Sequence, residues 1–372
     1  MRLRVLQIGK FYYPVPGGME DHLYHLCNEL KDRCELRVVV ANTKPKTEIS
    51  NVDGVEVIRV FSLGEIFSVL ICPTMFVWLR KFSPNIFHLH LPNPMAHVSY
   101  ILARPKAKLI ITWHSDVVKR VIRLQLYKPF LVSLLHRAER IIATSPAYVK
   151  HSPFLNKFRD KTKVVPLGID LKKFQSNRKV QKTTAEIRSK FGGRIILFAG
   201  RLTYYKGLEY LIEAMRHVEG GLIIIGSGRL EKKLRNQVNN FELQSKVTFL
   251  GEVSHQDIVC YFQACDLLVL PSVERSEAFG IVQLEAMACS KPVISTKLRT
   301  GVPWVNEDGK TGIVVPPRNS GALAQAINAL LEDPSLRKKY GENGRIRVEK
   351  EFTKERVAMK TLDLYKETFG SG

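Results

Sequence analysis

Hydrophobic residues in the first half of the chain fall into short runs rich in Val, Ile and Leu, separated by amphipathic segments. The runs that predict strands span 2–9, 35–41, 55–60, 85–90, 108–114, 140–145 and 163–170. Helical spacing of apolar residues predicts helices over 18–31, near 64–82, after Pro94 and near 117–138. Nearly continuous apolar strands that alternate with helices predict a parallel, doubly wound α/β sheet covered on both faces.

The same pattern restarts after a polar, basic stretch at 171–193. Six further apolar runs predict strands at 194–200, 222–226, 246–251, 266–272, 292–296 and 311–316. We therefore predict two Rossmann-like domains, covering 1–170 and 171–350. The amphipathic pattern near the end predicts a terminal helix within 351–372, which could pack on either half, including back on the first domain.

Composition and cysteine spacing are those of an ordinary soluble protein. Of the 372 residues, 45% are hydrophobic and 25% are charged, which is typical of globular domains. The six cysteines show no C-x-x-C or Cys/His ligand spacing, so we expect reduced thiols, no disulfides and a cytoplasmic location. The most apolar window, 66–79, contains Pro73 and falls short of the roughly 20 residues that span a bilayer. We predict that it is a buried helix.

The formal net charge of +22 is spread over both halves of the chain. A positive field attracts nucleotide phosphates, an anionic membrane surface and nucleic acid alike, so charge alone does not select the partner. The sequence contains no helix-turn-helix or aromatic RNA-binding signature. A nucleic-acid-binding protein is therefore only a distant alternative, and we expect no nucleic acid partner.

The segment 276–288 carries the most specific chemistry. Its sequence, S-E-A-F-G-I-V-Q-L-E-A-M-A, follows the apolar run 266–272, and the spacing predicts a loop that leads into a helix beginning near Gly280. Glu277 and Glu285 bracket this helix N-terminus. The N-terminus offers unpaired N–H groups and partial positive charge to an anion, while carboxylates are suited to binding sugar hydroxyls. The segment therefore indicates a nucleotide sugar as ligand.

A second loop places Arg201 and Lys206 directly after the predicted strand 194–200. Two cations at the end of a strand can clamp a diphosphate, although solvated surface charges are the alternative. The Asp-x-Asp element of metal-dependent transferases is missing from the sequence. We therefore expect Arg201, Lys206 and a helix dipole, rather than Mg²⁺ or another cofactor, to neutralise a leaving diphosphate.

Three further patterns have both a functional and a purely structural interpretation. Gly17-Gly18, where a helix is predicted to begin, can bring backbone amides close to a phosphate or a sugar, or can simply form a flexible turn. His114, at the end of a predicted strand, can bind a sugar hydroxyl or transfer a proton, or can be a satisfied strand-end histidine. His88 and His90 share one strand face, but no third ligand is evident, so we predict no zinc site.

Together, these motifs resemble family 4 glycosyltransferases, retaining enzymes of the GT-B fold. The resemblance covers nearly the whole chain and rests on four elements in order: the Gly17-Gly18 loop, His114 after a strand, Arg201 and Lys206 in R-x4-K spacing, and the E-x7-E pair Glu277 and Glu285. It implies two Rossmann-like domains that face a cleft. The second domain would hold the nucleotide-sugar donor, and the acceptor would enter from the first.

The resemblance implies a role for the charged residues of the second domain. Arg201 and Lys206 would bind the donor diphosphate. Glu277 would bind hydroxyls of the donor sugar, and Glu285 would accept hydrogen bonds from the ribose hydroxyls. Gly17-Gly18 would complete the donor-binding set from the first domain.

The remaining site residues are also implied by the resemblance. The amides of Phe279, Gly280 and Ile281 would lie beside the sugar and phosphate. His114 would contact the transferred sugar near its reacting face. His114 and Glu277 are therefore the residues expected at the reacting sugar.

Three segments point to a narrower branch: H-L-P-N-P (90–94), W-H-S-D (113–116) and the run 300–317. They are similar to bacterial transferases that build lipopolysaccharide O-antigen, many of them mannosyltransferases using GDP-mannose. Arg299 departs from the smaller residue expected just before the third segment. The branch implies a membrane-embedded, polyprenyl-diphosphate-linked oligosaccharide as acceptor.

A basic and apolar helix predicted after His114 offers a surface for anionic lipid. Its basic residues are Lys119, Arg120, Arg123, Lys128, Arg137 and Arg140. Each basic residue near a membrane contributes about 1 kcal/mol to binding, although a solvated basic face is the alternative. We expect a cytoplasmic protein bound peripherally to the inner face of the cytoplasmic membrane.

The expected reaction retains the anomeric configuration. No nucleophile is evident in the first domain, and the two carboxylates are assigned to hydroxyl binding rather than to double displacement. We therefore predict attack on the same face, with the leaving diphosphate oxygen taking the acceptor proton. A nucleotide-sugar epimerase or phosphorylase built on the same double sheet is the alternative within this fold class.

Overall fold

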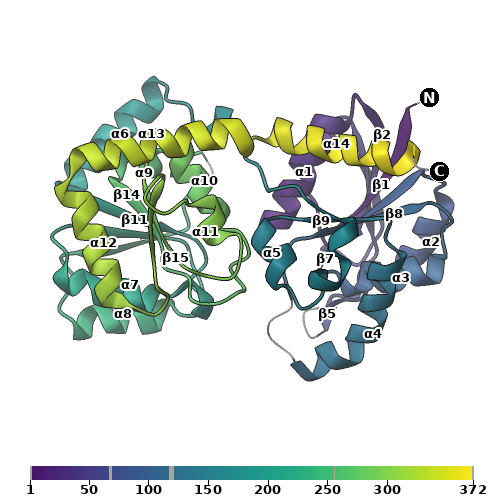
Figure 1. Cartoon of the computed structure of the whole chain (residues 1–372), viewed down its shortest axis with the longest axis horizontal. Coiled ribbons are helices and arrows are strands. Elements are labelled where there is room, and N and C mark those ends of the chain that lie inside the picture. Colours follow the sequence, from purple (N-terminus) through teal and green to yellow (C-terminus); the bar gives the residue numbers. More distant parts are fainter. Residues whose placement is uncertain (1, 67–68, 117–120, 255, 371–372) are drawn as a thin grey trace. The chain divides into compact units, whose positions relative to one another are not determined.

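The computed structural model describes residues 2–66, 69–116, 121–254 and 256–370, which form two compact units (Figure 1). Unit 1 comprises the described residues up to Leu167 together with those from Lys354 onward. Unit 2 comprises Gly168–Thr353. The chain therefore leaves unit 1 once and returns to it for the C-terminal helix.

Eight strands among the described residues of unit 1 form one sheet in the order β10-β9-β8-β7-β1-β2-β4-β3. All neighbours pair in parallel except β3, which runs antiparallel to β4 at the edge. The strands are β1 (Leu3–Ile8), β2 (Cys34–Ala41), β3 (Glu48–Val52), β4 (Val55–Val60), β7 (Ile86–Leu91), β8 (Lys108–Trp113), β9 (Arg140–Ala143) and β10 (Thr162–Val164). The predicted doubly wound sheet is confirmed. The sequence pattern missed β3 because the edge strand is polar and exposes Ile49.

Helices cover both faces of this sheet (Figure 1). They are α1 (Gly18–Leu30), α2 (Met75–Lys81), α3 (Pro94–Ala103), α4 (Val121–Arg137), α5 (Pro146–His151), the 3-10 segment η1 (Leu155–Lys161) and α14 (Lys354–Gly370). The C-terminal α14 packs against α1. Its Val357 and Leu362 belong to the same buried cluster as Leu23 and Leu26 of α1. Helix α14 is therefore part of the core of unit 1.

The predicted helix near 64–82 is wrong in its first half. There, β5 (Glu65–Ile66) and β6 (Val69–Leu70) form a small antiparallel pair, and the backbone N–H of Ile71 donates to Gly64 O at 3.0 Å. Gly64 has a φ of 97°, which glycine adopts at little cost. Pro73 has no N–H to donate within a helix, so α2 begins only at Met75. Among the described residues, no helix combines the length and hydropathy that crossing a membrane requires.

Unit 2 contains a six-stranded sheet within its described residues, with every neighbouring pair parallel. The order is β13-β12-β11-β14-β15-β16. The strands are β11 (Ile195–Ala199), β12 (Gly221–Ile225), β13 (Val247–Gly251), β14 (Leu267–Leu270), β15 (Val293–Thr296) and β16 (Gly312–Val315). This is the strand order of a dinucleotide-binding Rossmann fold, in which the connections reverse direction between the first and fourth strands.

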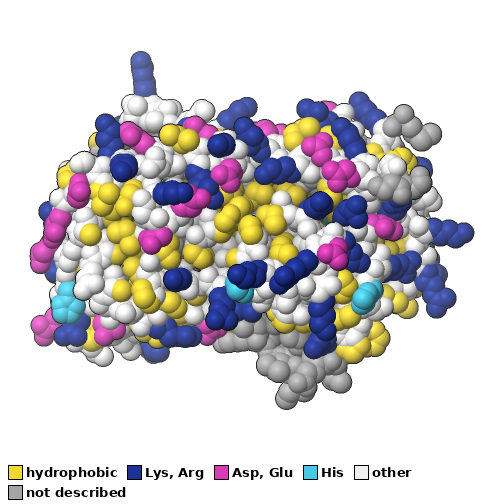
Figure 2. Space-filling model, in the orientation of Figure 1, with side chains coloured by type: hydrophobic (Ala, Val, Ile, Leu, Met, Phe, Trp, Pro, Cys, Tyr) yellow, Lys and Arg dark blue, Asp and Glu magenta, His cyan; other side chains and the backbone are white. Residues whose placement is uncertain are grey.

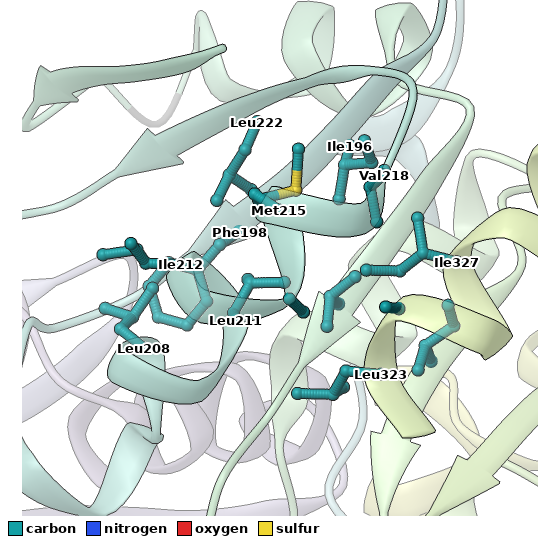
Figure 3. Close-up of a cluster of buried hydrophobic side chains, with 14 of the residues drawn as sticks. Ile196, Phe198, Leu208, Leu211, Ile212, Met215, Val218, Leu222, Leu323 and Ile327 are labelled. Atoms are coloured by element: carbon teal, nitrogen blue, oxygen red, sulfur yellow. The ribbon is translucent and has the colours of Figure 1, made fainter. Parts of the chain in front are cut away.

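Helices also cover the sheet of unit 2. They are η2 (Leu171–Phe174), α6 (Arg178–Phe191), η3 (Tyr204–Lys206), α7 (Leu208–Ala214), η4 (Met215–His217), α8 (Glu231–Asn240), α9 (Ile258–Ala264), α10 (Ile281–Ala288), α11 (Val302–Val305), α12 (Ser320–Glu332) and α13 (Pro334–Glu351). Figure 3 shows side chains of β11, α7 and α12 meeting in one buried cluster, among them Phe198, Leu211 and Ile327. This packing fixes the strand ends from which the site loops leave.

Candidate functional site

The strand order of unit 2 brings the predicted donor residues to one edge of the sheet. Strand β11 pairs with β12 on one side and β14 on the other, so the connections reverse between β11 and β14. In doubly wound sheets, ligands bind beyond the carboxyl ends of the strands at this reversal. The loop after β11 carries Arg201 and Lys206, and the loop after β14 carries Glu277.

Lys206 and Glu277 form a buried ion pair. Lys206 Nζ lies 2.6 Å from Glu277 Oε2, with 11% and 9% of the two side chains exposed. Ser272 Oγ donates a second hydrogen bond to the same carboxylate oxygen at 2.9 Å. Charge-assisted bonds of this kind are short and strong. The two residues that the sequence assigned to diphosphate and sugar thus hold each other in place.

The loops that carry this ion pair are fastened to each other through the backbone. Val273 N donates to Tyr205 O at 2.8 Å. Gly207 adopts a left-handed conformation, with φ 66° and ψ 26°, and a Cβ at this position would lie 2.2 Å from Pro271 O. Glycine permits both this conformation and this close approach. The glycine after Lys206 therefore lets the two loops meet.

Arg201 lies in the same loop as Lys206 but, unlike the residues of the ion pair, it is exposed. Its neighbour Leu202 is fully buried, and Leu202 N donates to Ser227 O at 2.8 Å. Arg201 itself is exposed at the end of β11. Because a guanidinium offers a fork of donors, Arg201 can reach a phosphate that lies beyond the strand ends.

Helix α10 begins where the sequence predicts. Gly280 precedes it with φ 73° and ψ 62°, and a Cβ there would lie 2.6 Å from Leu270 Cδ2. Phe279 is buried, whereas Ile281 is half-buried. The first N–H groups of an α-helix have no intrahelical acceptor and favour an anion. The backbone at 279–281 can therefore serve a phosphate or a sugar oxygen.

The other two positions that the sequence singled out near the donor site, Glu285 and Arg299, come before and after β15 in the sequence. Glu285 is half-buried within α10, so the E-x7-E spacing places Glu277 before the helix and Glu285 on it. Arg299 is exposed in the loop that follows β15. Its neighbour Thr300 is buried, and Thr300 Oγ1 accepts from Val302 N at 3.4 Å.

In unit 1, His114 lies at the end of β8 and belongs to a cluster of histidines. It is 5% exposed, and its Nε2 lies 3.0 Å from Nδ1 of His90. The ring of His22, from α1, lies edge-on to His114 with 5.2 Å between centroids. The functional and the structural interpretations of His114 are thus compatible, because one ring nitrogen is hydrogen-bonded to His90 and the other has no hydrogen-bond partner among the described residues.

Burial sets the protonation of these rings. It lowers the pKa of His114 and of His90 well below the ordinary histidine value, and it lowers the pKa of His22 to about 4. The three rings are therefore neutral near pH 7. His114 can accept or donate a single hydrogen bond at the site, but it does not offer a positive charge.

The same three histidines are the set in the described residues that could hold a metal ion. One ring nitrogen from each lies within 4.8 Å of the others. The sequence pattern pairs His88 with His90 as possible metal ligands and does not reveal His22, which α1 brings to the strand ends. However, Nδ1 of His90 and Nε2 of His114 already hydrogen-bond to each other.

The Gly17-Gly18 pair lies at the start of α1. Helix α1 begins at Gly18, and Gly17 before it is extended, with a φ of 164°. A Cβ on Gly17 would lie 2.1 Å from Oε2 of Glu20, a side chain that is 8% exposed. Sequence reasoning missed Glu20 because an acidic residue in the first turn of a helix is ordinary. The glycine makes room for this buried carboxylate.

Each half of the chain matches the model of a glycosyltransferase family. Residues 16–173 match the model described as Glycosyltransferase Family 4, and residues 180–347 match the model described as Glycosyl transferases group 1. The O-antigen chain mannosyltransferase C of Escherichia coli is 34% identical over 98% of this chain and 98% of that protein. The D-rhamnosyltransferase WbpZ of Pseudomonas aeruginosa is 32% identical over 94% of this chain and 92% of that protein.

Solved structures show the same fold. The sucrose-phosphate synthase of Thermosynechococcus elongatus superposes with a TM-score of 0.83 at 24% identity, covering 100% of both chains. HepE of Anabaena, solved in complex with UDP, superposes with a TM-score of 0.78 at 21% identity, covering 98% of this chain and 100% of that one. The chain therefore belongs to glycosyltransferase family 4 and is a hexosyltransferase of the GT-B fold.

Proposed function

We propose that this hexosyltransferase transfers mannose from GDP-mannose to a polyprenyl-diphosphate-linked oligosaccharide during O-antigen synthesis. The buried Lys206–Glu277 pair at the strand reversal of unit 2 carries the proposal. In this pair a cation that would bind the diphosphate lies beside a carboxylate that would bind the sugar, and Rossmann-like sheets bind ligands at such a strand reversal. The full-length similarity to an O-antigen chain mannosyltransferase supports the choice of sugar and pathway.

The donor would be held by three groups of contacts in unit 2. Arg201 and Lys206 bind the diphosphate, since both leave the end of β11. Glu277 accepts from sugar hydroxyls while Ser272 and Lys206 hold its carboxylate. The N-terminus of α10 adds backbone donors, and Glu285 on that helix accepts from the ribose.

We also propose that the transfer needs no metal ion. The diphosphate that leaves is stabilised by Arg201, Lys206 and the dipole of α10, which together supply the charge that Mg²⁺ supplies elsewhere. The absence of an Asp-x-Asp element from the sequence is consistent with this proposal. Turnover that survives EDTA supports it, and activity restored only by a divalent ion contradicts it.

The proposed chemistry is a same-face substitution. The acceptor hydroxyl oxygen forms a bond to the anomeric carbon as the bond from that carbon to the diphosphate oxygen breaks. The proton of the acceptor hydroxyl moves to the leaving diphosphate oxygen. His114, neutral because of its burial, hydrogen-bonds a hydroxyl of the transferred sugar and takes no proton from the acceptor.

A second donor sugar has support from one relative. The Pseudomonas aeruginosa protein is a D-rhamnosyltransferase, and D-rhamnose is mannose without its 6-hydroxyl. A direct competition between GDP-mannose and GDP-D-rhamnose decides between them. A hydrogen-bonding site built for the 6-hydroxyl rejects the deoxy sugar strongly, whereas an apolar site does not.

The membrane part of the proposal rests on an apolar face of unit 1 that lies next to a basic residue, Arg80. Helix α3 exposes Val98, Ile101 and Leu102, which share one helix face. Helix α2 lies against α3, and its Arg80 donates to Leu102 O at 2.7 Å. Apolar side chains next to cations are what an anionic lipid surface binds.

The basic helix proposed from the sequence is only partly described. Lys119 and Arg120 lie outside the described residues, and the side chain of Arg123 is not described either. Of the others, Lys128 and Arg137 are exposed on α4. The prediction that Arg140 belongs to this helix is wrong, because α4 ends at Arg137 and Arg140 begins β9, where it is half-buried. In Figure 2, Lys and Arg side chains are spread over the drawn face rather than gathered in a single patch.

The product of the purified full-length enzyme tests the proposed function. The enzyme is incubated with GDP-mannose and a polyprenyl-diphosphate-linked oligosaccharide, and the new linkage is read by NMR. The proposal predicts an α-linked mannose, as in the donor. An inverted linkage contradicts the mechanism, and turnover of the nucleotide sugar without acceptor, or with phosphate, favours an epimerase or a phosphorylase.

A further inference from the structure

A buried chain of hydrogen bonds in unit 1 links His114 to the C-terminal helix. Its other members come from β1, β7, β8 and α14, and each is at most 2% exposed: Gln7, His88, His90, Thr112 and Tyr365. Polar groups that are buried this deeply are expensive unless they are hydrogen-bonded. Each of these side chains has a partner within the chain of bonds.

The contacts run continuously from one end to the other. Nε2 of His114 lies 3.0 Å from Nδ1 of His90, and Nε2 of His90 lies 3.0 Å from Oε1 of Gln7. Nε2 of Gln7 donates to the Tyr365 hydroxyl at 2.8 Å. That hydroxyl lies 2.6 Å from Nδ1 of His88.

The Gln7 amide determines where the protons lie. Its Oε1 can only accept, so Nε2 of His90 carries a proton. Because burial keeps both rings neutral, Nδ1 of His90 has a lone pair and accepts from Nε2–H of His114. His114 is then left with a lone pair on Nδ1. On the other side, Tyr365 accepts from Gln7 and donates to His88.

Tyr365 reaches these strands because α14 is fixed at both ends. Near its start, Lys354 lies 3.2 Å from Glu29 of α1. Near its end, Lys108 Nζ donates to Thr368 O at 2.7 Å. Tyr365 lies between these contacts and is fully buried. Helix α14 therefore supplies the Tyr365 hydroxyl to the interior of unit 1.

We infer that Gln7 and Tyr365 are positioning residues for His114, holding its ring in the Nε2-protonated tautomer so that Nδ1 can accept from a hydroxyl of the transferred sugar. In the structure the Tyr365 hydroxyl accepts from the Gln7 amide nitrogen, which leaves the amide oxygen facing His90. Without that hydroxyl the amide can turn over, and His114 then populates its other tautomer. The inference rests on the proposed function for the sugar contact, and on the hydrogen-bond geometry together with the burial of the rings for the tautomer.

The tautomer is measured directly on the full-length chain labelled with nitrogen-15 histidine. His114→Asn identifies the signal of His114. We expect an Nε2-protonated ring in the native protein and a mixture dominated by the Nδ1-protonated ring in Tyr365→Phe. An Nδ1-protonated ring in the native protein, or an unchanged tautomer in Tyr365→Phe, overturns the inference. This measurement needs no sugar transfer, so it remains decisive if the proposed donor is wrong.

Kinetics then separate positioning from general damage to the fold. Tyr365→Phe should lower kcat about tenfold and leave the KM for the donor within about twofold. In a His114→Ala background the same change should alter kcat by less than about twofold, because coupled residues are not additive. A tenfold loss in both backgrounds overturns the inference.

Two further variants complete the comparison. Gln7→Met breaks the same chain one step closer to His114 and should reproduce the loss of kcat. Tyr100→Phe is the matched control, since Tyr100 is another fully buried tyrosine of unit 1 outside this chain of bonds, and it should leave kcat unchanged. If Tyr100→Phe lowers kcat as much as Tyr365→Phe does, the effect is not specific to this chain of hydrogen bonds and the inference fails.

Discussion

Lys206 and Glu277 come from loops that follow different strands of unit 2, yet their charged atoms lie 2.6 Å apart and are almost fully buried. Each loop contributes one charge, and neither loop could hold its charge there alone without a desolvation cost. The pair therefore orders the two loops before any donor binds.

Breaking this pair should be costly for both stability and activity. Removing one partner of a buried pair typically costs about 3–5 kcal/mol, so Lys206→Met and Glu277→Gln should each lower the free energy of unfolding and reduce kcat/KM by about 10–100-fold. The double variant should be more stable than the sum of the two single losses predicts. Urea unfolding of the four proteins measures this coupling.

An exposed ion pair of unit 2 provides the control. Lys338 and Glu342 lie 3.9 Å apart, with 77% and 57% of their side chains exposed. Their coupling should be below about 1 kcal/mol, and their removal should leave turnover intact. Equal coupling in the buried and the exposed pair would contradict the account.

Gly207 should tolerate a side chain much less well than Gly309. Both have a positive φ, 66° and 70°, so alanine costs about 1–2 kcal/mol at either position from the backbone alone. At Gly207 the new Cβ also meets Pro271 O at 2.2 Å, whereas at Gly309 nothing lies within 4 Å. Gly207→Ala should therefore unfold at a lower temperature than Gly309→Ala and should lose turnover. Matching thermal curves and matching turnover would show that the close approach is unimportant.

The buried histidines should make unit 1 less stable in mild acid. Burial lowers the pKa of His22 to about 4, whereas the unfolded chain has the ordinary value near 6.5. Between these two values the unfolded state binds more protons, so stability falls as the pH drops from about 6.5 toward 4, by up to about 1.4 kcal/mol per pH unit. His22→Gln should reduce this dependence.

Urea unfolding at pH 7 and pH 5 measures the effect. His217→Asn is the control because His217 is exposed in unit 2. The free energy of unfolding of this variant should change with pH as that of the native protein does. A His22→Gln protein whose stability changes with pH as much as the control would contradict the assignment.

The apolar face of α3 should be needed for binding to anionic vesicles. Replacing Ile101 and Leu102 with serine removes two exposed apolar side chains, so flotation with phosphatidylglycerol vesicles at low salt should decrease. Ile346→Ser is the matched control, since Ile346 is 60% exposed on α13 of unit 2. High salt should release the native protein, because the basic residues contribute through screened charge. No binding at low salt would remove the membrane proposal.

The local features of both units could be predicted from the sequence. Buried parallel strands are continuous runs of Val, Ile and Leu, and the motif residues follow them directly, so positions such as Arg201, Glu277 and Gly280 are readable from the sequence. The pairing of β5 with β6 was missed because the sequence at 65–70 is apolar enough to look helical. There, Gly64 permits the conformation that precedes the strand pair, and Pro73 delays the start of α2.

Contacts between distant segments could not be predicted. Gln7 and Tyr365 are 358 positions apart, and no periodicity links them. His22 is on a helix, and only the packing of α1 brings it to His114. The Lys206–Glu277 pair likewise depends on β11 and β14 being neighbours, which sequence spacing does not state.

Calorimetric titration of GDP-mannose into the native protein and into Glu285→Ala, together with turnover of both, tests the donor site most directly. Glu285 lies on α10 and is not a member of the ion pair that holds the loops, and thermal unfolding checks that Glu285→Ala is folded. The account predicts that donor affinity falls by about tenfold or more, since hydrogen bonds to a charged group contribute about 1.5–3 kcal/mol. Unchanged affinity and turnover in a folded Glu285→Ala protein would contradict it.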